Sequence, residues 1–438
     1  MDQTLSSAYI EILREELLPA MGCTEPIALA YGAARVRDLL GELPEEVRVT
    51  VSGNLVKNAK SVTVPNTGGL RGIEAAVAAG LVAGKADKLL EVIADVTDAD
   101  RGEIHKYLQK NCISVTLGES SLAFDYTISV RGGGHEASLR VANAHTNVVF
   151  LEKDGQVLQD TPVEGEASNG LSDHSCLSVE KIVEFAETVD LSLVEDLLDR
   201  QIQCNMAICQ EGLDHVWGAC IGRTILRFGG DDPQNKAKAW AAAGSDARMN
   251  GCSLPVVILS GSGNQGITAS VPVVVCARDW GIGRDKMLRA LLVSDLTAIH
   301  LKTALGRLSA FCGAVCAGAG AGAGICYLEG GRYREIAHTL VNALAISSGI
   351  ICDGAKASCA GKIALSVEAG FLGWNMYRCD NEFFGGHSVV FDKAQRRKRS
   401  CCDNANPRRG FCTKRRLQQE EHANRNRKRT DRKNDLSK

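Results

Sequence analysis

The spacing of apolar residues predicts a helix over residues 4–40 that is broken once, at the turn Met-Gly-Cys-Thr-Glu-Pro (residues 21–26). In this turn Thr24 is a predicted N-cap of the second helical segment, and Pro26 lies just inside it. The turn therefore places Cys23 at or beside a helix N-terminus. The helix dipole there favours a thiolate, although an ordinary helix break explains the same residues.

Alternation of apolar and polar residues predicts short strands in the next part of the chain. The sequence Gly-Asn-Leu-Val-Lys-Asn at residues 53–58 is expected to form a polar loop, and helical patterns return at residues 73–83 and 87–96. From about residue 176 the pattern is helical, apart from a polar turn at residues 245–248 and a glycine-rich loop at residues 260–266. The predicted strands cover residues 47–52, 61–65, 112–117, 124–131, 136–142, 146–152 and 156–159.

This pattern predicts an α+β fold that is mainly helical and contains a small inserted α+β domain. We expect residues 1–85 to form the N-terminal part of a catalytic domain and residues 86–165 to form the insert. Residues 166–392 would form the helical part of the catalytic domain. Apolar periodicity ends after Asp392, so residues 393–438 are expected to be a basic, disordered tail.

Charge is distributed unevenly along the 438 residues. The tail from Lys393 holds 17 Lys and Arg against 5 Asp and Glu, a net charge of +12, which leaves −14 for the rest of the total of −2. The near-neutral total therefore gives no sign of specific nucleic-acid binding. The N-terminus has no basic start followed by an apolar run, and the Ala- and Gly-rich residues 310–324 favour a packed internal helix over a membrane span. We expect a cytoplasmic protein with a small-molecule substrate and no membrane association, and leave a homo-oligomer open.

Seventeen cysteines in a reducing compartment are expected to be thiols or metal ligands rather than disulfides. Cys352 and Cys359 are seven residues apart, which is two helical turns, or about 10 Å, in an unbroken helix. A single zinc ion cannot bridge that gap unless the Cys-Asp-Gly turn breaks the helix, whereas an iron–sulfur cluster spans it more readily. Together with Cys312, these residues are candidate ligands. Spacing alone favours the alternative that these cysteines are buried apolar thiols, and Cys316 and Cys326 in the Ala- and Gly-rich run are expected to be such thiols.

Three other features are candidates for binding or catalysis. The glycine-rich loop at residues 260–266 has small residues and polar side chains suited to a carboxylate or phosphate, but such loops also recur by chance. Lys57 is either a Schiff-base lysine or a simple charge on a polar loop. His145 is a lone histidine, and such a residue more often has a structural role than a catalytic one. The candidate ligand-binding side chains of the glycine-rich loop are Ser262, Asn264 and Gln265.

Several segments, taken together and in order, resemble the L-cysteine desulfidase family, which is related to the α-chain of iron–sulfur L-serine dehydratases. The resemblance runs from about residue 8 to residue 386 and stops where the sequence becomes basic and rich in cysteine, which suggests a shifted reading frame. The segments that carry it are residues 22–26, 52–58, 144–147, 245–249, 260–266, 308–312, 351–355 and 358–359.

The resemblance implies the helical fold of the iron–sulfur serine dehydratase α-chain and an oxygen-sensitive [4Fe–4S] cluster without pyridoxal phosphate. By matching motifs, the cluster ligands fall on Cys312, Cys352 and Cys359, with one iron open for substrate. Cys23 corresponds to the proposed base, and it remains open whether it is also a fourth ligand. The implied reaction is β-elimination of L-cysteine to hydrogen sulfide, ammonia and pyruvate. The residues expected to orient the substrate are Asn54, Asn58, Ser260, Ser262, Asn264 and Gln265.

Three alternative functions remain open at this point. The same cluster can dehydrate L-serine, with hydroxide in place of sulfide as the leaving group. A pyridoxal phosphate lyase would use Lys57 as the Schiff base and the loop at residues 260–266 as the phosphate cradle. A non-enzymatic iron–sulfur redox sensor would use the basic tail to bind nucleic acid, but it has no need of a substrate cradle.

Overall fold

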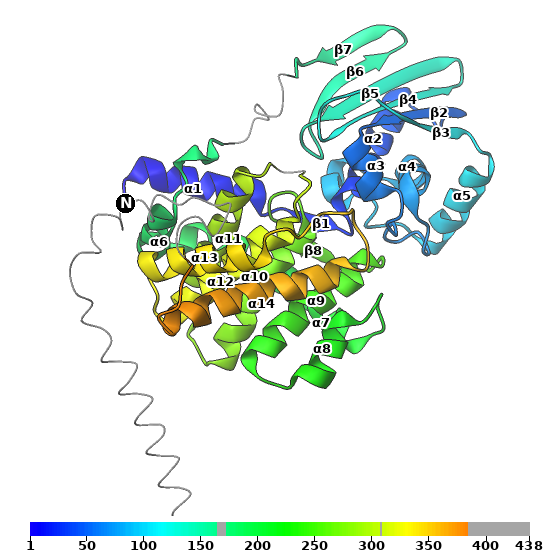
Figure 1. The fold of residues 1–438 in the computed structure, drawn as a ribbon. Helices are drawn as coiled ribbons and strands as arrows, with labels where there is room; N and C mark the ends of the chain where they lie inside the picture. Colours follow the sequence, from blue (N-terminus) through cyan, green and yellow to red (C-terminus); the bar gives the residue numbers. More distant parts are fainter. Residues whose placement is uncertain (164–171, 307–308, 384–438) are drawn as a thin grey trace, which may run out of the picture.

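The computed structural model describes residues 1–163, 172–306 and 309–383. Figure 1 shows a smaller lobe that contains a β-sheet and a larger lobe made of helices. The predicted α+β fold is confirmed. The basic segment expected at residues 393–438 lies outside the described residues.

The smaller lobe contains a six-stranded sheet with strand order β3-β2-β4-β5-β6-β7. Strand β2 runs parallel to β3, and all other neighbouring strands are antiparallel. Every second residue of β2 is buried, as the alternation in its sequence predicts. The strands are β2 (Glu46–Val51), β3 (Ile113–Leu117), β4 (Asp125–Gly132), β5 (His135–Ala142), β6 (Val148–Lys153) and β7 (Gln156–Asp160).

Helices of the smaller lobe pack against this sheet. Helix α2 contacts β4 and β5, and Tyr126 of β4 donates a hydrogen bond of 2.6 Å to the carbonyl of Ala28 in α2. Because β2 lies between β3 and β4, the sheet takes residues from both sides of the boundary expected between residues 85 and 86. The helices of this lobe are α2 (Thr24–Leu40), α3 (Gly53–Ala59), α4 (Gly72–Ala83) and α5 (Asp98–Gln109).

The larger lobe is organised around α12 (Gly313–Leu328), which contacts α10, α11, α13 and α14. Glycine and alanine make up most of α12, and its neighbours approach its backbone closely; a Cβ at Gly318 would lie 2.4 Å from the carbonyl oxygen of Ser366. The packed internal helix predicted here is therefore present. The other helices are α1 (Gln3–Glu16), α6 (Val179–Thr188), α7 (Glu195–Asp214), α8 (Ile221–Gly229), α9 (Pro233–Met249), α10 (Gly263–Asp279), α11 (Arg284–Thr303), α13 (Tyr333–Ser347) and α14 (Cys359–Arg378).

Four local expectations were wrong. The predicted polar loop at residues 53–58 is helix α3, because Leu55 and Ala59 bury one face at helical spacing. The predicted polar turn at residues 245–248 forms the buried C-terminal end of α9.

The other two errors concern shorter segments. Residues 61–65 form only an isolated bridge, between Thr63 and Arg71, because the segment that pairs with them enters helix α4 at Gly72. The helical pattern at residues 87–96 gives a short 3₁₀ turn that is interrupted at Leu89, whose φ is 50°.

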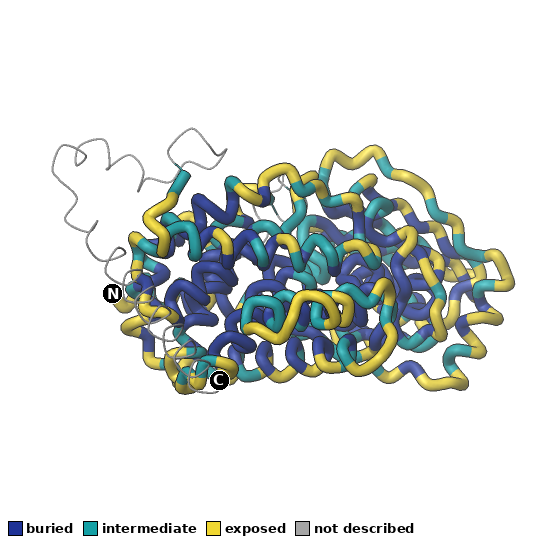
Figure 2. Tube along the Cα trace, turned by 60° about the horizontal axis from the view of Figure 1, so that its bottom comes forward, coloured by how far each residue is buried: buried dark blue, intermediate teal, exposed yellow. Residues whose placement is uncertain are grey.

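The two lobes share one core. Most of their buried apolar residues form one contiguous cluster, and Figure 2 shows buried segments in dark blue running through the length of the molecule. Strand β1 (Pro19–Met21), between α1 and α2, pairs antiparallel with β8 (Pro255–Val257) of the larger lobe. The pairing fixes the start of α2 against the larger lobe. No helix in the described ranges is long and apolar enough to cross a membrane.

Candidate active site

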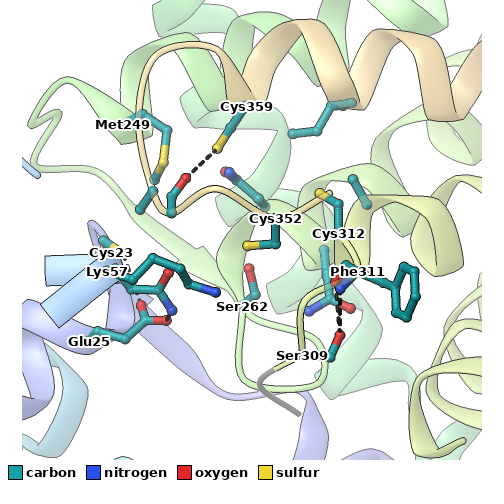
Figure 3. Close-up of a pocket in the computed structure, with 18 of the residues that line it drawn as sticks. Cys23, Glu25, Lys57, Met249, Ser262, Ser309, Phe311, Cys312, Cys352 and Cys359 are labelled. Carbon is teal, nitrogen blue, oxygen red and sulfur yellow. Dashed lines mark hydrogen bonds between the residues drawn. The ribbon is translucent and has the colours of Figure 1, made fainter. Parts of the chain in front are cut away.

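A pocket lies where the two lobes meet. Its walls come from the N-terminal ends of α2, α10, α12 and α14, together with α3, the end of α9 and the chain between α13 and α14. Figure 3 shows the side chains that line it. Its empty space is about 720 Å³, part of it open to solvent.

Two of the three predicted ligand cysteines are held side by side by backbone hydrogen bonds. The amide of Cys312 donates to the carbonyl of Ile350 (3.0 Å), and the amide of Cys352 donates to the carbonyl of Ala310 (2.8 Å). These bonds join the segment before α12 to the segment before α14, although the two are 40 residues apart in the sequence. Both thiols line the pocket.

Cys359 is the first residue of α14, and the chain between Cys352 and Cys359 is not helical. The Cys-Asp-Gly turn thus interrupts the helix, a possibility that the spacing argument had left open. Gly354 in this turn has a φ of +97°, and a Cβ there would lie 2.4 Å from the carbonyl oxygen of Lys57. The loop packs directly on α3, which only glycine permits at this position.

The donor set fits an iron–sulfur cluster better than a single metal ion. Within the described ranges, no three His, Cys, Asp or Glu side chains are grouped closely enough to hold one ion. Instead, three free thiols surround one pocket. Burial raises the pKa of Cys312, and the neighbouring thiols Cys352 and Cys359 raise it further. Sulfur donors spread around a pocket suit the larger dimensions of a cluster.

Cys23, rather than the predicted Thr24, is the N-cap residue of α2, and it faces the same pocket. It packs with Met249 against Cys359, and its side chain is only 4% exposed. The helix dipole led us to expect a thiolate at Cys23, and this expectation was wrong. Burial raises the pKa of the Cys23 thiol well above its usual value, and the adjacent Glu25 carboxylate raises it further. The thiol instead donates a hydrogen bond of 3.0 Å to Oε2 of Glu25.

Glu25 is a buried carboxylate with several polar neighbours. Oε1 accepts a hydrogen bond from Nδ2 of Asn58 (2.9 Å), and Oε2 accepts one from Oγ1 of Thr24 (3.1 Å). Burial raises the pKa of Glu25, but the charge of His145, the Cys23 hydrogen bond and other contacts outweigh it, so the pKa lies below its usual value. His145, given a structural role in the sequence analysis, therefore helps to keep Glu25 ionised.

Cationic and amide side chains complete the lining. Arg248, at the end of α9, is 2% exposed and donates from Nη1 to Oδ1 of Asn264 (3.1 Å). Lys57 and Lys302 also line the pocket. Oδ1 of Asn58 is buried without a hydrogen-bond partner among the described residues. The pocket thus offers positive charge and an acceptor, which suits a zwitterionic ligand.

The glycine-rich loop forms the N-terminal end of α10, a helix of 17 residues. Thr24 ties the loop to α2, because its one Oγ1 hydrogen is shared between the carbonyl of Gly261 (3.0 Å) and Oε2 of Glu25. Three of the predicted substrate-binding side chains of this loop line the pocket, but Ser260 is buried behind it, and Asn54 of α3 is also outside the lining. The three that line the pocket are Ser262, Asn264 and Gln265.

Sequence reasoning assigned no role to Glu25, Arg248 or Lys302. Glu25 and Arg248 lie within quoted motifs, residues 22–26 and 245–249, and a charged residue among small and apolar neighbours is the signal that singles out Arg248. Lys302 has no comparable local signal, because it lies outside the quoted motifs and a lysine near the C-terminal end of a helix is ordinary. Only the fold brings it to the pocket.

Residues 87–405, which include Cys312, Cys352 and Cys359, match the model of the serine dehydratase alpha chain, a family of lyase-type enzymes. The chain belongs to this family, so the predicted relationship is confirmed. It is also similar to proteins named UPF0597. One from Desulfitobacterium hafniense is 54% identical over 87% of this chain and 89% of its own length. Others from Treponema denticola (45% identical; 90% and 93%) and Actinobacillus pleuropneumoniae serotype 5b (35% identical; 91% and 93%) match similarly.

Proposed function

We propose that the protein is an L-cysteine desulfidase, which eliminates the β-thiol of L-cysteine to give hydrogen sulfide, ammonia and pyruvate. The observation that carries this proposal is the convergence of Cys312, Cys352, Cys359 and Cys23 on one pocket that also holds groups suited to an amino acid. Membership of a lyase family that is generally iron–sulfur dependent supports it.

Cys312, Cys352 and Cys359 would hold a [4Fe–4S] cluster, which would supply a Lewis-acidic iron with an open position to activate the leaving group. The positive end of the α12 dipole, beside Cys312, favours the negative charge of a thiolate-ligated group at this end of the pocket. Lys362 contributes further positive charge, because its ammonium acts on both Cys312 and Cys359.

The chain's own residues bind and orient the substrate. Arg248 and Lys57 supply positive charge for the α-carboxylate, and the side chains at the start of α10, Ser262 and Asn264, add hydrogen bonds. The unpartnered Oδ1 of Asn58 accepts from the α-ammonium. Together these contacts fix the direction of the Cα–H bond.

Cys23 receives the α-proton, because it lines the pocket next to Cys359 at the end where the cluster ligands meet. Loss of this proton and cleavage of the Cβ–S bond give aminoacrylate, which hydrolyses to pyruvate and ammonia in water. The apolar side chains of Met249 and Ile363 in the lining limit the access of water until then.

L-serine is the second candidate substrate, supported by the name of the matching family. Its reaction uses the same proton removal and the same binding groups, with hydroxide as the leaving group. The two substrates differ only at the β-heteroatom, so a direct comparison of rates distinguishes them.

The test is anaerobic purification followed by assays of sulfide and pyruvate from L-cysteine and L-serine. We expect equal amounts of sulfide and pyruvate from L-cysteine and a higher kcat/KM for it than for L-serine. A higher value for L-serine would make the protein a serine dehydratase. Absence of pyruvate from both substrates, in protein that contains iron and sulfide, would contradict the proposed function.

A further inference from the structure

The hydrogen bond from Cys23 to Glu25 gives the site a feature that the proposed function leaves unused. The Cys23 thiol directs its proton at Oε2 of Glu25, 3.0 Å away, and both side chains are buried. A cysteine that donates its proton in this way is not an independent base. It needs an acceptor for its own proton before, or while, it takes another.

Glu25 is arranged as such an acceptor. Asn58 and Thr24 hold its two oxygens by hydrogen bonds of 2.9 and 3.1 Å, so the carboxylate has one fixed orientation toward Cys23. His145 and Arg248 act on it electrostatically and favour the ionised form. Among the described residues that line the pocket, Glu25 is the only carboxylate. An ionised carboxylate oriented by a third group beside a thiol is the arrangement of a catalytic dyad.

We propose that Glu25 is a positioning and proton-accepting residue that acts through Cys23, which relays the substrate α-proton to it. This inference rests on the proposed function. In the step, the Cα–H bond breaks and its proton bonds to Sγ of Cys23, while the original Sγ proton bonds to Oε2 of Glu25. The electron pair left on Cα forms the Cα–Cβ double bond, and the Cβ–S pair leaves with hydrosulfide. Glu25 then loses its proton to water, which restores the starting state and balances the reaction.

The alternative role for Glu25 is to bind the substrate α-ammonium. Three of its hydrogen-bond positions are already taken by Cys23, Thr24 and Asn58. Asn58, in contrast, has a buried oxygen without a partner among the described residues. The geometry therefore assigns the substrate α-ammonium to Asn58. Glu25 remains free to accept the proton that Cys23 passes on.

The test compares Glu25→Gln and Glu25→Asp with the wild type and with Asp295→Asn. Glutamine has nearly the same shape as glutamate and keeps an acceptor oxygen, but it cannot take a proton at neutral pH. Asp295 is an equally buried carboxylate that bonds to Gln201 in α7, outside the pocket lining. It therefore controls for the general loss of a buried acid.

We expect Glu25→Gln to lower kcat by roughly 10²–10⁴, the usual contribution of a positioned acid or base, with KM and iron content close to wild type. Exchange of the α-proton with solvent should slow by the same factor. Glu25→Asp should recover part of the rate, and Asp295→Asn should retain it. An unchanged kcat in Glu25→Gln, or a raised KM with unchanged kcat, would overturn the inference.

A second readout does not depend on turnover. The Glu25 carboxylate holds the Cys23 thiol through their 3.0 Å hydrogen bond, so its removal should shift the rate at which Cys23 is alkylated. Mass spectrometry of the Cys23 peptide after treatment with iodoacetamide measures this shift in each variant. The same alkylation profile in wild type and Glu25→Gln would show that the two groups are uncoupled and overturn the inference. A wild type that releases no sulfide or pyruvate would instead contradict the proposed function.

Discussion

The thiols that line the pocket, here called the rim thiols (Cys23, Cys312, Cys352 and Cys359), differ from the thiols in the interior of the helical lobe. Both groups are largely buried. Cys316 and Cys326 lie within α12 and pack against apolar neighbours, and burial raises the pKa of Cys316 to about 11. Burial also raises the pKa of Cys312 and Cys359. Burial alone therefore does not separate a ligand from a packing residue.

What separates the two groups is the place of each cysteine in its secondary-structure element. Cys23 and Cys312 occupy helix N-caps, and Cys359 is the first residue of α14. At these positions the side chain projects beyond the helix end into the pocket, and unpaired backbone amides add positive potential. Interior cysteines have neither feature. A thiol at a helix start is thus available to a ligand, while a thiol one turn or more further along the helix only fills space.

The largest effect on activity is expected when one of the rim thiols proposed as cluster ligands is replaced. Replacing Cys352 with Ser should abolish the broad visible absorbance of an iron–sulfur cluster and all turnover, because only two thiols would remain to hold it. Among the three cysteines proposed as ligands, Cys352 lies outside any helix, so its replacement does not change helix stability directly. Iron analysis and absorbance spectra of the anaerobically purified variant check this. Retained iron with full activity would remove Cys352 from the ligand set.

The second-largest effect is expected at Cys23, and it shows whether this residue is a catalytic base or a cluster ligand. Cys23→Ala should keep the cluster absorbance and lower turnover by roughly 10²–10⁴. Cys252→Ala is the matched control, because Cys252 is similarly buried, 3% exposed, but does not line the pocket. Steady-state rates and spectra of both variants are the measurement. A changed spectrum in substrate-free Cys23→Ala would instead identify Cys23 as a fourth ligand, and wild-type turnover would exclude both roles.

Substitutions in the interior of the helical lobe should change the free energy of unfolding rather than the rate of turnover. Gly318→Ala places a Cβ 2.4 Å from the carbonyl oxygen of Ser366, so α12 and α14 must separate, at a cost of about 1–3 kcal/mol. Gly102→Ala in α5 meets no atom within 4 Å and should be neutral or stabilising. Urea unfolding of the two variants gives the comparison. Equal stability of Gly318→Ala and wild type would show that this close contact is not required.

The smallest effect is expected for an interior thiol. Cys326→Ala should cost of the order of 1 kcal/mol through lost packing and leave iron content and turnover unchanged. Urea unfolding and the sulfide assay are the measurements. Loss of iron in this variant would show that interior and rim thiols are not distinct.

Much of the fold could be predicted because its signals are local. Alternation predicts the five strands between residues 112 and 159, and small residues predict the packing of α12. Polar composition was misleading at α3 and at the end of α9, where the side chains of Asn58 and Arg248 point into a buried site. Tertiary hydrogen bonds to Glu25 and Asn264 hold these two side chains there, and no local pattern indicates such contacts.

The same limit applies to the site. Motifs indicated Cys23, Cys312, Cys352 and Cys359, but the protonation of Cys23 depends on burial by residues distant in sequence. The helix dipole, which can be inferred locally, favours a thiolate; desolvation and Glu25 outweigh it. Residues that act through long-range contacts, Glu25 and Lys302 among them, become recognisable only when the lobes are placed together.

The most direct test of the central claim is the count of iron and acid-labile sulfide in the anaerobically purified wild-type protein, taken together with its rate of sulfide release from L-cysteine. The account predicts about four irons and four sulfides per chain, as a [4Fe–4S] cluster requires, and a rate that falls as iron is lost on exposure to air. Protein that is free of iron yet releases sulfide and pyruvate at full rate would contradict it.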